Sequence, residues 1–453
     1  MRTLRTSPEL TSHTPSSTSP APQPSAAVSV PRPDASDAAA RTNTGRFARL
    51  PLLAGRSFIP LGLLARLPLA MLTVGTLTMV TSVSGSYAAG GTAAGAVGIG
   101  SALGAPVLGS LADRRGQRPV LLAAAVVNTI AVAALILAAA AAGTSGGPVG
   151  AVLAAALVAG ASSPQVGPLA RVRWMALVAR EPAENTSRDL DTALSYESTA
   201  DEITFVLGPA LVGILASLVA PWLPLAVAAA MTVVLVPAFA VHPTHRAVRP
   251  AARKAAGIRG RGRKFPAAVA LPVVAMVCMG TFFGSTQAAL SSFSATLAGS
   301  EIAGLLYAAM GLSSAAAALS VAYWPRTFAL AWRWAVSAGL MALLAALLLL
   351  PGSLTSMVVV LLILGIPVGP VMVTVFTVGG VLAPSGRLGT VMTALASGIV
   401  AGTALGSSIG GHLAQDGGHH AAFLVPIAAA LALALLGAAA AVVLRRRRTD
   451  ALA

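Results

Sequence analysis

The stretch Gly109-Ser-Leu-Ala-Asp113-Arg-Arg-Gly116-Gln-Arg118-Pro-Val-Leu121 joins two long apolar segments, residues 87–110 and 119–142. Gly109 and Gly116 permit a tight reversal of the chain between two helices. Pro119 suits the first turn of the second helix. Asp113 can face a positive helix N-terminus or a nearby arginine. The stretch is therefore predicted to be a charged turn between two spanning helices.

Twelve segments of the chain are long and apolar enough to span a membrane as helices, which takes about 20 residues each. Six precede the polar stretch 244–264 and six follow it, so the halves are about equal in length, as in a duplicated transporter fold. The predicted fold class is an all-α membrane protein with about twelve transmembrane helices in two six-helix halves. The segments are 57–84, 87–110, 119–142, 147–170, 195–219, 222–243, 266–294, 300–323, 328–350, 354–380, 388–413 and 420–444.

The composition supports a membrane protein. Hydrophobic residues make up 56% of the 453 residues and charged residues only 10%, whereas a soluble domain needs about 25% charged residues to wet its surface. The single cysteine, Cys278, excludes an intrachain disulfide. The net charge of +16 would suggest nucleic acid on a soluble protein. Here the charges lie in alternate loops and indicate topology and contact with anionic lipid, so no nucleic-acid partner is predicted.

The basic residues give an orientation for the spans. Of the 30 lysines and arginines, 29 are assigned to the part before residue 57, to alternate connections or to the part after the last span, and the other is Arg66. The opposite connections contain only Glu301 and Asp416 as charged residues. Because basic loops stay inside, both termini are predicted to be cytoplasmic, in a plasma or inner cell membrane. Outside the tail and the basic central loop, the residues counted are Arg114, Arg115, Arg118, Arg171, Arg173, Arg180, Arg188, Arg326, Arg333, Arg387 and Arg445–Arg448.

These patterns divide the chain into five parts. Residues 1–56 are predicted to be a disordered cytoplasmic tail, because residues 1–48 are rich in Ser, Thr, Pro and Ala and have no hydrophobic stretch. Residues 57–243 form the first six-helix bundle and residues 266–444 the second. Residues 244–265 are a basic cytoplasmic linker between them, and residues 445–453 are a basic cytoplasmic tail.

The turn at Gly109, Asp113, Arg114, Gly116 and Arg118 resembles the loop signature of the major facilitator superfamily, Gly-x-Leu-Ala-Asp-Arg-x-Gly followed by two basic residues. It lies between the second and third spans, where that family has it. Gln117 departs from the usual basic residue. The resemblance implies transport by alternating access and a role for this loop in holding the two halves together on the cytoplasmic side. The equivalent loop of the second half, around Tyr323-Trp324-Pro325-Arg326, lacks the pattern.

A second, weaker resemblance lies in the fifth span. Gly208 and Pro209 followed by Gly213 resemble the family's antiporter motif, although Thr204 and Val212 stand where glycines are expected. Proline inside a helix removes a backbone hydrogen bond, so a kink is predicted here. The motif favours export, and a plain kink remains the alternative.

Charges inside a span cost about 2.5–3.5 kcal/mol each and usually face a partner or a cavity. At 1.5 Å per residue, Arg66 lies about 13 Å into the first span, and Asp201 and Glu202 lie about 11 Å into the fifth. Glu197 is a further acidic residue in the fifth span. We therefore expect an Arg66–Asp201 or an Arg66–Glu202 pair, with the remaining carboxylate as a candidate proton site. The alternative is that these residues lie at the membrane interface.

Small and neutral polar residues give two further expectations. Glycines repeat at four-residue intervals in the second and eleventh spans, and such ridges allow helices to approach closely. The resemblance implies that these spans meet between the halves, so Gly100, Gly104, Gly398, Gly402 and Gly406 are predicted interface glycines, with static packing as the alternative. The resemblance also places the fourth and seventh spans around a central cavity. The candidate lining residues are Ser163, Gln165, Thr286 and Gln287.

No enzyme signature fits this arrangement. Gly406-Ser-Ser-Ile-Gly410 matches a nucleophile pattern, but that chemistry needs a strand-turn-helix elbow and this stretch lies in a span. No metal site, catalytic residue or cofactor is predicted. The predicted function is secondary active transport of a small organic solute, working as a monomer and exporting the solute with protons as the coupling ion. The alternatives are an importer or facilitator, or a membrane receptor or assembly factor on the same scaffold.

Overall fold

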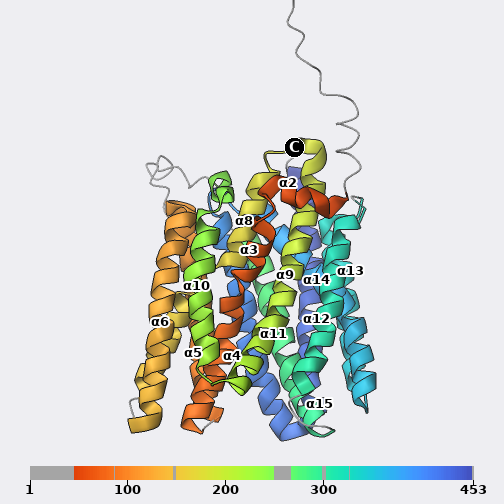
Figure 1. Ribbon diagram of the computed structural model, residues 1–453. Helices are drawn as coiled ribbons and strands as arrows, with labels where there is room; N and C mark the ends of the chain where they lie inside the picture. Colours follow the sequence, from red (N-terminus) through yellow and green to blue (C-terminus); the bar gives the residue numbers. More distant parts are fainter. Residues whose placement is uncertain are drawn as a thin grey trace, which may run out of the picture. The chain divides into compact units, whose positions relative to one another are not determined.

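The computed structural model describes residues 45–85, 87–145, 149–248, 267–297, 302–325 and 327–450. Within these residues the secondary structure is helical and contains no strand. Most of the predicted tail, most of the predicted linker and the last three residues lie outside the described residues. The long helices run alongside one another, and their connections gather at two ends (Figure 1).

The helices of the first half are η1 (Arg46–Arg49), α2 (Leu50–Ala54), α3 (Phe58–Leu64), α4 (Leu67–Ser84), α5 (Tyr87–Arg115), α6 (Gln117–Ser145), α7 (Val149–Ala161), α8 (Val166–Val178), α9 (Ala183–Leu218), α10 (Leu223–Val241) and η2 (Pro243–Ala247). Those of the second half are α11 (Ala267–Ala295), α12 (Ala303–Ser320), η5 (Val321–Tyr323), α13 (Leu330–Ala345), η6 (Ala346–Leu349), α14 (Leu354–Leu382) and α15 (Leu388–Asp450).

The helices account for the twelve predicted spans. Eleven segments of the described residues are long and apolar enough to cross a membrane, and one of them, Leu388–Ala441, has 54 residues. A straight helix of that length would measure about 80 Å, against a hydrocarbon core of about 30 Å. Gly418 breaks α15 with φ 70° and ψ −173°, a conformation that glycine adopts at little cost. This segment therefore makes two crossings, and the all-α prediction of about twelve helices is confirmed.

Two spans of the first half are interrupted. The first span breaks between α3 and α4 at Ala65 and Arg66, and the fourth breaks between α7 and α8 at residues 162–165. Both breaks are buried. Irregular backbone at membrane depth is tolerated only where protein or a cavity surrounds it. The breaks therefore place polar backbone and side chains inside the first half.

One end of the bundle, here called the basic end, carries the α5–α6, α8–α9 and α14–α15 connections. Hydrogen bonds tie these regions together: the backbone N–H of Gly389 donates to Asp113 Oδ1 over 2.8 Å. Arg180 Nη2 donates to the carbonyl of Ala247 over 2.9 Å, so the described start of the linker lies at the same end. The chain turns of the opposite end include Gly85, Ala220 and Gly418.

The prediction of a disordered tail through residue 56 is wrong for residues 46–54. These residues form η1 and α2, here called the N-terminal segment. Leu50 and Ala54 are buried in the apolar core of the first half. Arg49 Nη2 lies 2.9 Å from Asp189 Oδ2 on α9. The prediction extended the low-complexity character of residues 1–48 to residue 56 and so overlooked the short apolar run at residues 50–54 that packs here.

The predicted interface glycines lie within each half and not between the halves. A side chain at Gly100 or Gly104 of α5 would meet the backbone of α7 at Leu157 and Ala161. Side chains at Gly398, Gly402 and Gly406 of α15 would meet α11 at Val273, Val277 and Thr281. The interface prediction is therefore wrong for these five residues. The glycine repeats indicated close helix packing correctly, but a repeat does not specify which helix is the partner.

The close packing of α15 on α11 gives a matched test. A methyl group at Gly402 would collide with the carbonyl oxygen of Val277, whereas nothing lies within 4 Å of a methyl group at Gly411. Gly402→Ala should destabilise the protein by about 1–3 kcal/mol, the usual cost of overpacking. Gly411→Ala should leave stability within about 0.5 kcal/mol of wild type. Thermal denaturation of the purified proteins compares them, and equal melting temperatures would reject the packing described.

Candidate functional site

A buried charge cluster occupies the break of the first span. Arg66 is only 4% exposed, because the break turns it toward α9. Its Nη1 lies 2.7 Å from Asp201 Oδ1 and its Nη2 lies 2.7 Å from Glu197 Oε2. Its Nε donates to the carbonyl of Gly62 over 2.9 Å. Of the two expected pairings, the structure contains Arg66–Asp201 and adds Glu197 as a second partner.

Arg171 of α8 completes the cluster from the other side of Asp201. Its Nη2 lies 2.7 Å from Asp201 Oδ2. Its guanidinium carbon lies 3.9 Å from the centre of the Phe376 ring of α14, so the cluster reaches the second half through a cation–π contact. Trp174 Nε1 donates to Glu197 Oε1 over 2.8 Å. Two arginines thus balance two carboxylates, which is the condition under which charges are tolerated away from water.

Arg171 and Arg173 were assigned to a loop by the count of basic residues, and that assignment is wrong. Both side chains are fully buried in α8, which continues the fourth span to Val178. Counting charges at span ends cannot distinguish a loop arginine from one that turns inward to a carboxylate. The available signal was the acidic residues of the fifth span, Glu197 and Asp201, which are four residues apart and so share a helix face.

Glu202 differs from its neighbour Asp201 in its partners. It is 6% exposed, and no residue in the described part of the chain forms a salt bridge with it. Ser314 Oγ of α12 donates to Glu202 Oε1 over 2.9 Å. Next to it, Thr199 Oγ1 donates to the carbonyl of Ala315 over 3.1 Å. Glu202 therefore lies where α9 of the first half meets α12 of the second.

Asp113 joins the two halves at the basic end. Its Oδ1 accepts the backbone N–H of Gly389 over 2.8 Å, and its Oδ2 accepts both the backbone N–H and the hydroxyl of Thr390 over 2.7 Å. These N–H groups belong to the first turn of α15, whose unsatisfied donors and dipole favour a carboxylate. We call the contacts of Asp113 with Gly389 and Thr390 the latch.

The two glycines of the same turn, Gly109 and Gly116, are required for different reasons. A side chain at Gly109 would collide with Thr393 and the carbonyl of Gly389, so this glycine lies between the halves. Gly116 has φ 90° and reverses the chain between α5 and α6. Arg114 and Arg118 are exposed at the basic end. The first motif turn is thus a contact between halves, whereas Gly100 and Gly104 above it are not.

Two further contacts join the halves at the basic end. Arg333 Nη1 of α13 lies 3.1 Å from Asp191 Oδ2 of α9. Arg46 of the N-terminal segment donates to the carbonyl of Ala322, and its guanidinium carbon lies 5.0 Å from the centre of the Tyr323 ring. Arg333 was assigned to a loop, but it is buried in the first turn of α13. The latch and these contacts thus join the two halves across the basic end, an arrangement that we call closed.

The residue that departs from the motif, Gln117, is buried and paired. Arg173 Nε donates to Gln117 Oε1 over 2.8 Å, and Arg173 Nη1 donates to the carbonyl of Phe239 over 2.7 Å. A basic residue at position 117 would remove that acceptor and bring a second cation to Arg173. Nearby, burial together with the charges of Arg173 and His245 lowers the pKa of His242. The printed hydrogen bonds of Arg173 all go to uncharged groups, namely Gln117, the Phe239 carbonyl and the Thr244 hydroxyl.

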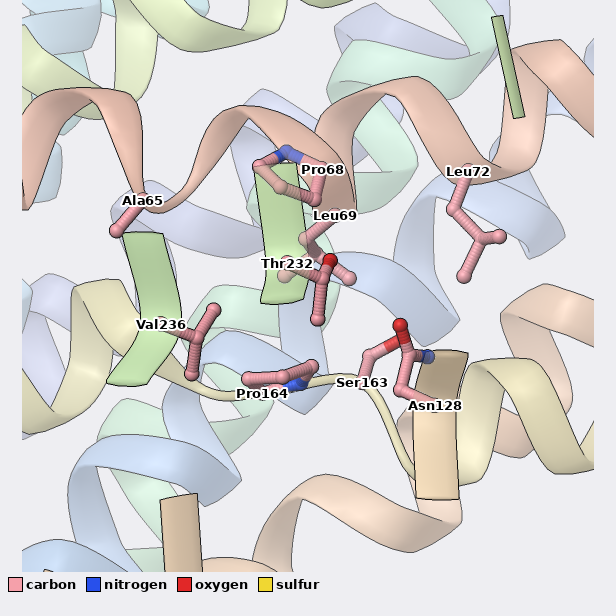
Figure 2. A pocket seen from close by; sticks show the side chains of 9 residues that line it. All are labelled: Ala65, Pro68, Leu69, Leu72, Asn128, Ser163, Pro164, Thr232 and Val236. Atoms are coloured by element: carbon pink, nitrogen blue, oxygen red, sulfur yellow. The ribbon is translucent and has the colours of Figure 1, made fainter. Parts of the chain in front are cut away.

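The four candidate cavity residues lie in the break of the fourth span and on α11. Ser163 lines a cavity of about 10 Å³ inside the first half, where the two span breaks meet, and this is about the room of one water molecule. Figure 2 shows Ser163 and Asn128 side by side there, with Thr232 pointing toward them. Gln165 is buried and donates to the carbonyl of Ser163. Thr286 is buried and donates to the carbonyl of Phe282, and Gln287 is exposed.

The helix α9 continues through the predicted kink at Gly208 and Pro209. Gly208 lies against α4, where a side chain would come within 2.6 Å of the Ala70 methyl group. Among the described residues, no group of three histidine, cysteine, aspartate or glutamate side chains is placed to hold a metal ion.

Comparison with known proteins agrees with this architecture. The chain matches the sequence model of the Major Facilitator Superfamily over residues 58–397. No curated protein matches its sequence. The human organic anion transporter MFSD10 (TETRAN) has a similar structure, with a TM-score of 0.64 and 19% identity over 84% of this chain and 98% of that one.

Two bacterial structures are also similar. A bacterial homologue of the iron transporter ferroportin in an outward-facing state gives a TM-score of 0.66 at 15% identity, over 84% of this chain and 98% of that one. The Escherichia coli fucose:proton symporter FucP gives 0.60 at 14% identity, over 85% of this chain and 99% of that one. At these identities the structures show the fold alone. The family match covers well over half of the residues, and the chain belongs to the major facilitator superfamily of transporters.

Proposed function

We propose that this protein is a secondary active transporter that exports a small organic solute in exchange for protons. The residues 57–243 and 266–444 form the two moving halves, and one chain supplies both, so the monomer is the working unit. The halves open alternately at the basic end and at the opposite end. Glu202 carries the coupled proton.

The observation that carries this proposal is the setting of Glu202. It is a buried carboxyl group at the junction of the halves, and it has a hydroxyl partner, Ser314, but no cation among the described residues. A carboxyl group without an ion pair can change its protonation state without breaking one. Asp201 has two arginine partners, so loss of its charge would leave two buried arginines with Glu197 as the one remaining carboxylate of the cluster. Glu202 is therefore the better proton carrier of the two.

The basic end faces the cytoplasm in this proposal. The described residues of this end include the exposed arginines Arg56, Arg114, Arg115 and Arg118, and basic connections stay inside. With the latch formed, the protein is then closed to the cytoplasm. Glu202 would take up a proton from outside and release it inside, and this proton movement would drive the solute outward.

The proposal predicts that Glu202→Gln abolishes coupling and preserves folding. Everted membrane vesicles with an acidic interior are exposed to amphipathic organic compounds one at a time, and loss of the pH gradient is followed. Wild type should dissipate the gradient with at least one compound. Glu202→Gln should lower that rate at least about a hundredfold. Glutamine keeps the hydrogen bond to Ser314, but its amide does not take up and release a proton as a carboxyl group does.

Asp416→Asn is the matched control, because Asp416 is exposed at the opposite end; this variant should behave as wild type. Gradient loss that is unchanged in Glu202→Gln would place the proton site elsewhere. Solute-dependent flux without proton movement would indicate a facilitator. If the gradient is lost only when solute leaves the vesicles together with the protons, the protein is an importer. Absence of solute binding and flux in proteoliposomes would favour a receptor or an assembly factor.

A further inference from the structure

One face of α9 carries a line of polar residues that crosses the junction of the halves. Asp191, Ser195, Ser198 and Glu202 follow one another at intervals of three and four residues, so they lie on the same face of the helix. We call them the α9 stripe. Its two ends contact the second half: Asp191 pairs with Arg333, and Glu202 accepts from Ser314. The stripe therefore faces the second half along its length.

The two serines in the middle of the stripe are buried without partners. Both are fully buried, and neither hydroxyl has a hydrogen-bond partner in the part of the chain that the structure describes. Other hydroxyls of the same helix behave differently. Thr204 donates to the carbonyl oxygen of Ala200, one turn earlier, and Thr199 shares its hydrogen between the carbonyl oxygens of Ser195 and Ala315. Unpaired buried hydroxyls are uncommon in native structures and call for an explanation.

The side chain of Arg171 on the neighbouring helix α8 also lacks hydrogen-bond partners for some of its nitrogens. Arg171 is fully buried, and its Nε and Nη1 have no partner among the described residues. Its Nη2 binds Asp201, less than one turn along α9 from Ser198. Two hydroxyls of α9 and two nitrogens of Arg171, whose guanidinium packs on Phe376 of the second half, thus lack hydrogen-bond partners among the described residues. Their desolvation is not compensated while the basic end is closed.

We propose that the α9 stripe forms the polar wall of the solute path when the basic end opens. Separation of the halves uncovers Ser195 and Ser198, whose hydroxyls then bind water and a hydrogen-bonding organic solute on its way to Glu202. The partners missing in the closed state are thus supplied in the open one. This inference rests on the proposed transport function and adds to it the side chains that receive the solute from the basic side.

The test measures exposure of the stripe without needing a solute. The native thiol is removed by Cys278→Ser, and Ser195→Cys or Ser198→Cys is introduced into the full-length protein. The purified protein is treated with a membrane-impermeant, hydrophilic maleimide. Each engineered position should react slowly with the latch intact. In an Asp113→Ala background it should react about tenfold faster or more, because reactivity follows the population of the open state.

Ala193→Cys is the matched control. Ala193 is also fully buried on α9 but belongs to the core of the first half, so it should stay unreactive with and without the latch. Serine positions that stay as unreactive as Ala193→Cys, although Asp113→Ala has separated the halves at the basic end, overturn the inference. A gain of reactivity that Ala193→Cys shares also overturns it, because that would report loosening of the whole helix.

A second measurement uses the closed state. The double change Ser195→Ala and Ser198→Ala removes two unpaired hydroxyls and should raise the melting temperature of the protein, whereas hydrogen-bonded serines would give a lower one. A lower melting temperature would overturn the inference. Neither readout depends on proton movement, so the two proposals can be separated. If the engineered cysteines react as expected but Glu202→Gln leaves proton flux unchanged, the α9 stripe is retained and Glu202 is rejected as the coupling site.

Discussion

Replacement of Arg66 by alanine should destabilise the protein by about 3–5 kcal/mol, the range found when one partner of a buried ion pair is removed. The change leaves Glu197 with Trp174 as its remaining side-chain partner. Asp201 keeps Arg171, so most of the loss comes from the uncompensated charge of Glu197. Thermal denaturation of the protein purified in detergent measures the effect, together with the yield of monodisperse protein.

The variant Arg56→Ala provides the control for removing an arginine from the same part of the chain. Arg56 is exposed in the turn before α3, and its loss should change stability by less than about 0.5 kcal/mol. Adding Glu197→Gln to Arg66→Ala should recover part of the loss, because the two residues interact and their effects are not additive. A double variant whose loss equals the sum of the single losses would show that Arg66 and Glu197 are not coupled.

The architecture followed from the sequence because a bilayer restricts what a chain can do. Long apolar stretches must be helices, since backbone groups in lipid need internal partners. The number of helices is also restricted, because an error of one helix would place basic connections on both sides of the membrane. The break at Gly418 falls between the predicted spans 388–413 and 420–444. Arg66 and Asp201 were also brought together by depth alone, because partners in lipid must lie at similar heights.

Apart from the Arg66–Asp201 pair, the partners of individual side chains did not follow from the sequence. Helix depth is encoded locally, but the direction a side chain takes around its helix depends on which helices pack beside it. Gly402 was assigned to the junction of the halves and lies against α11. Arg171 was assigned to a loop and is buried against Asp201 and Phe376. Ser195 and Ser198 gave no signal, because serine is common in membrane helices as a carbonyl-bonded side chain.

Loss of the latch should shift the protein toward the state in which the basic end is open. Asp113→Ala removes the acceptor of three hydrogen bonds from Gly389 and Thr390. Hydrogen bonds to a charged group contribute about 1.5–3 kcal/mol each. If the net loss equals one such bond, the ratio of open to closed molecules rises about ten- to hundredfold, at 1.4 kcal/mol per factor of ten.

Spin labels at Ala179→Cys and Ser385→Cys, in a Cys278→Ser background, measure this shift as a distance between the halves. Both residues are exposed at the basic end, one after α8 and the other before α15. The distance distribution of Asp113→Ala should gain a longer component that wild type lacks. Thr390→Val should show a smaller gain, because it removes one of the three bonds and keeps both backbone donors. If Asp113→Ala and wild type give the same distribution, the Asp191–Arg333 pair and the N-terminal segment hold the basic end closed without the latch.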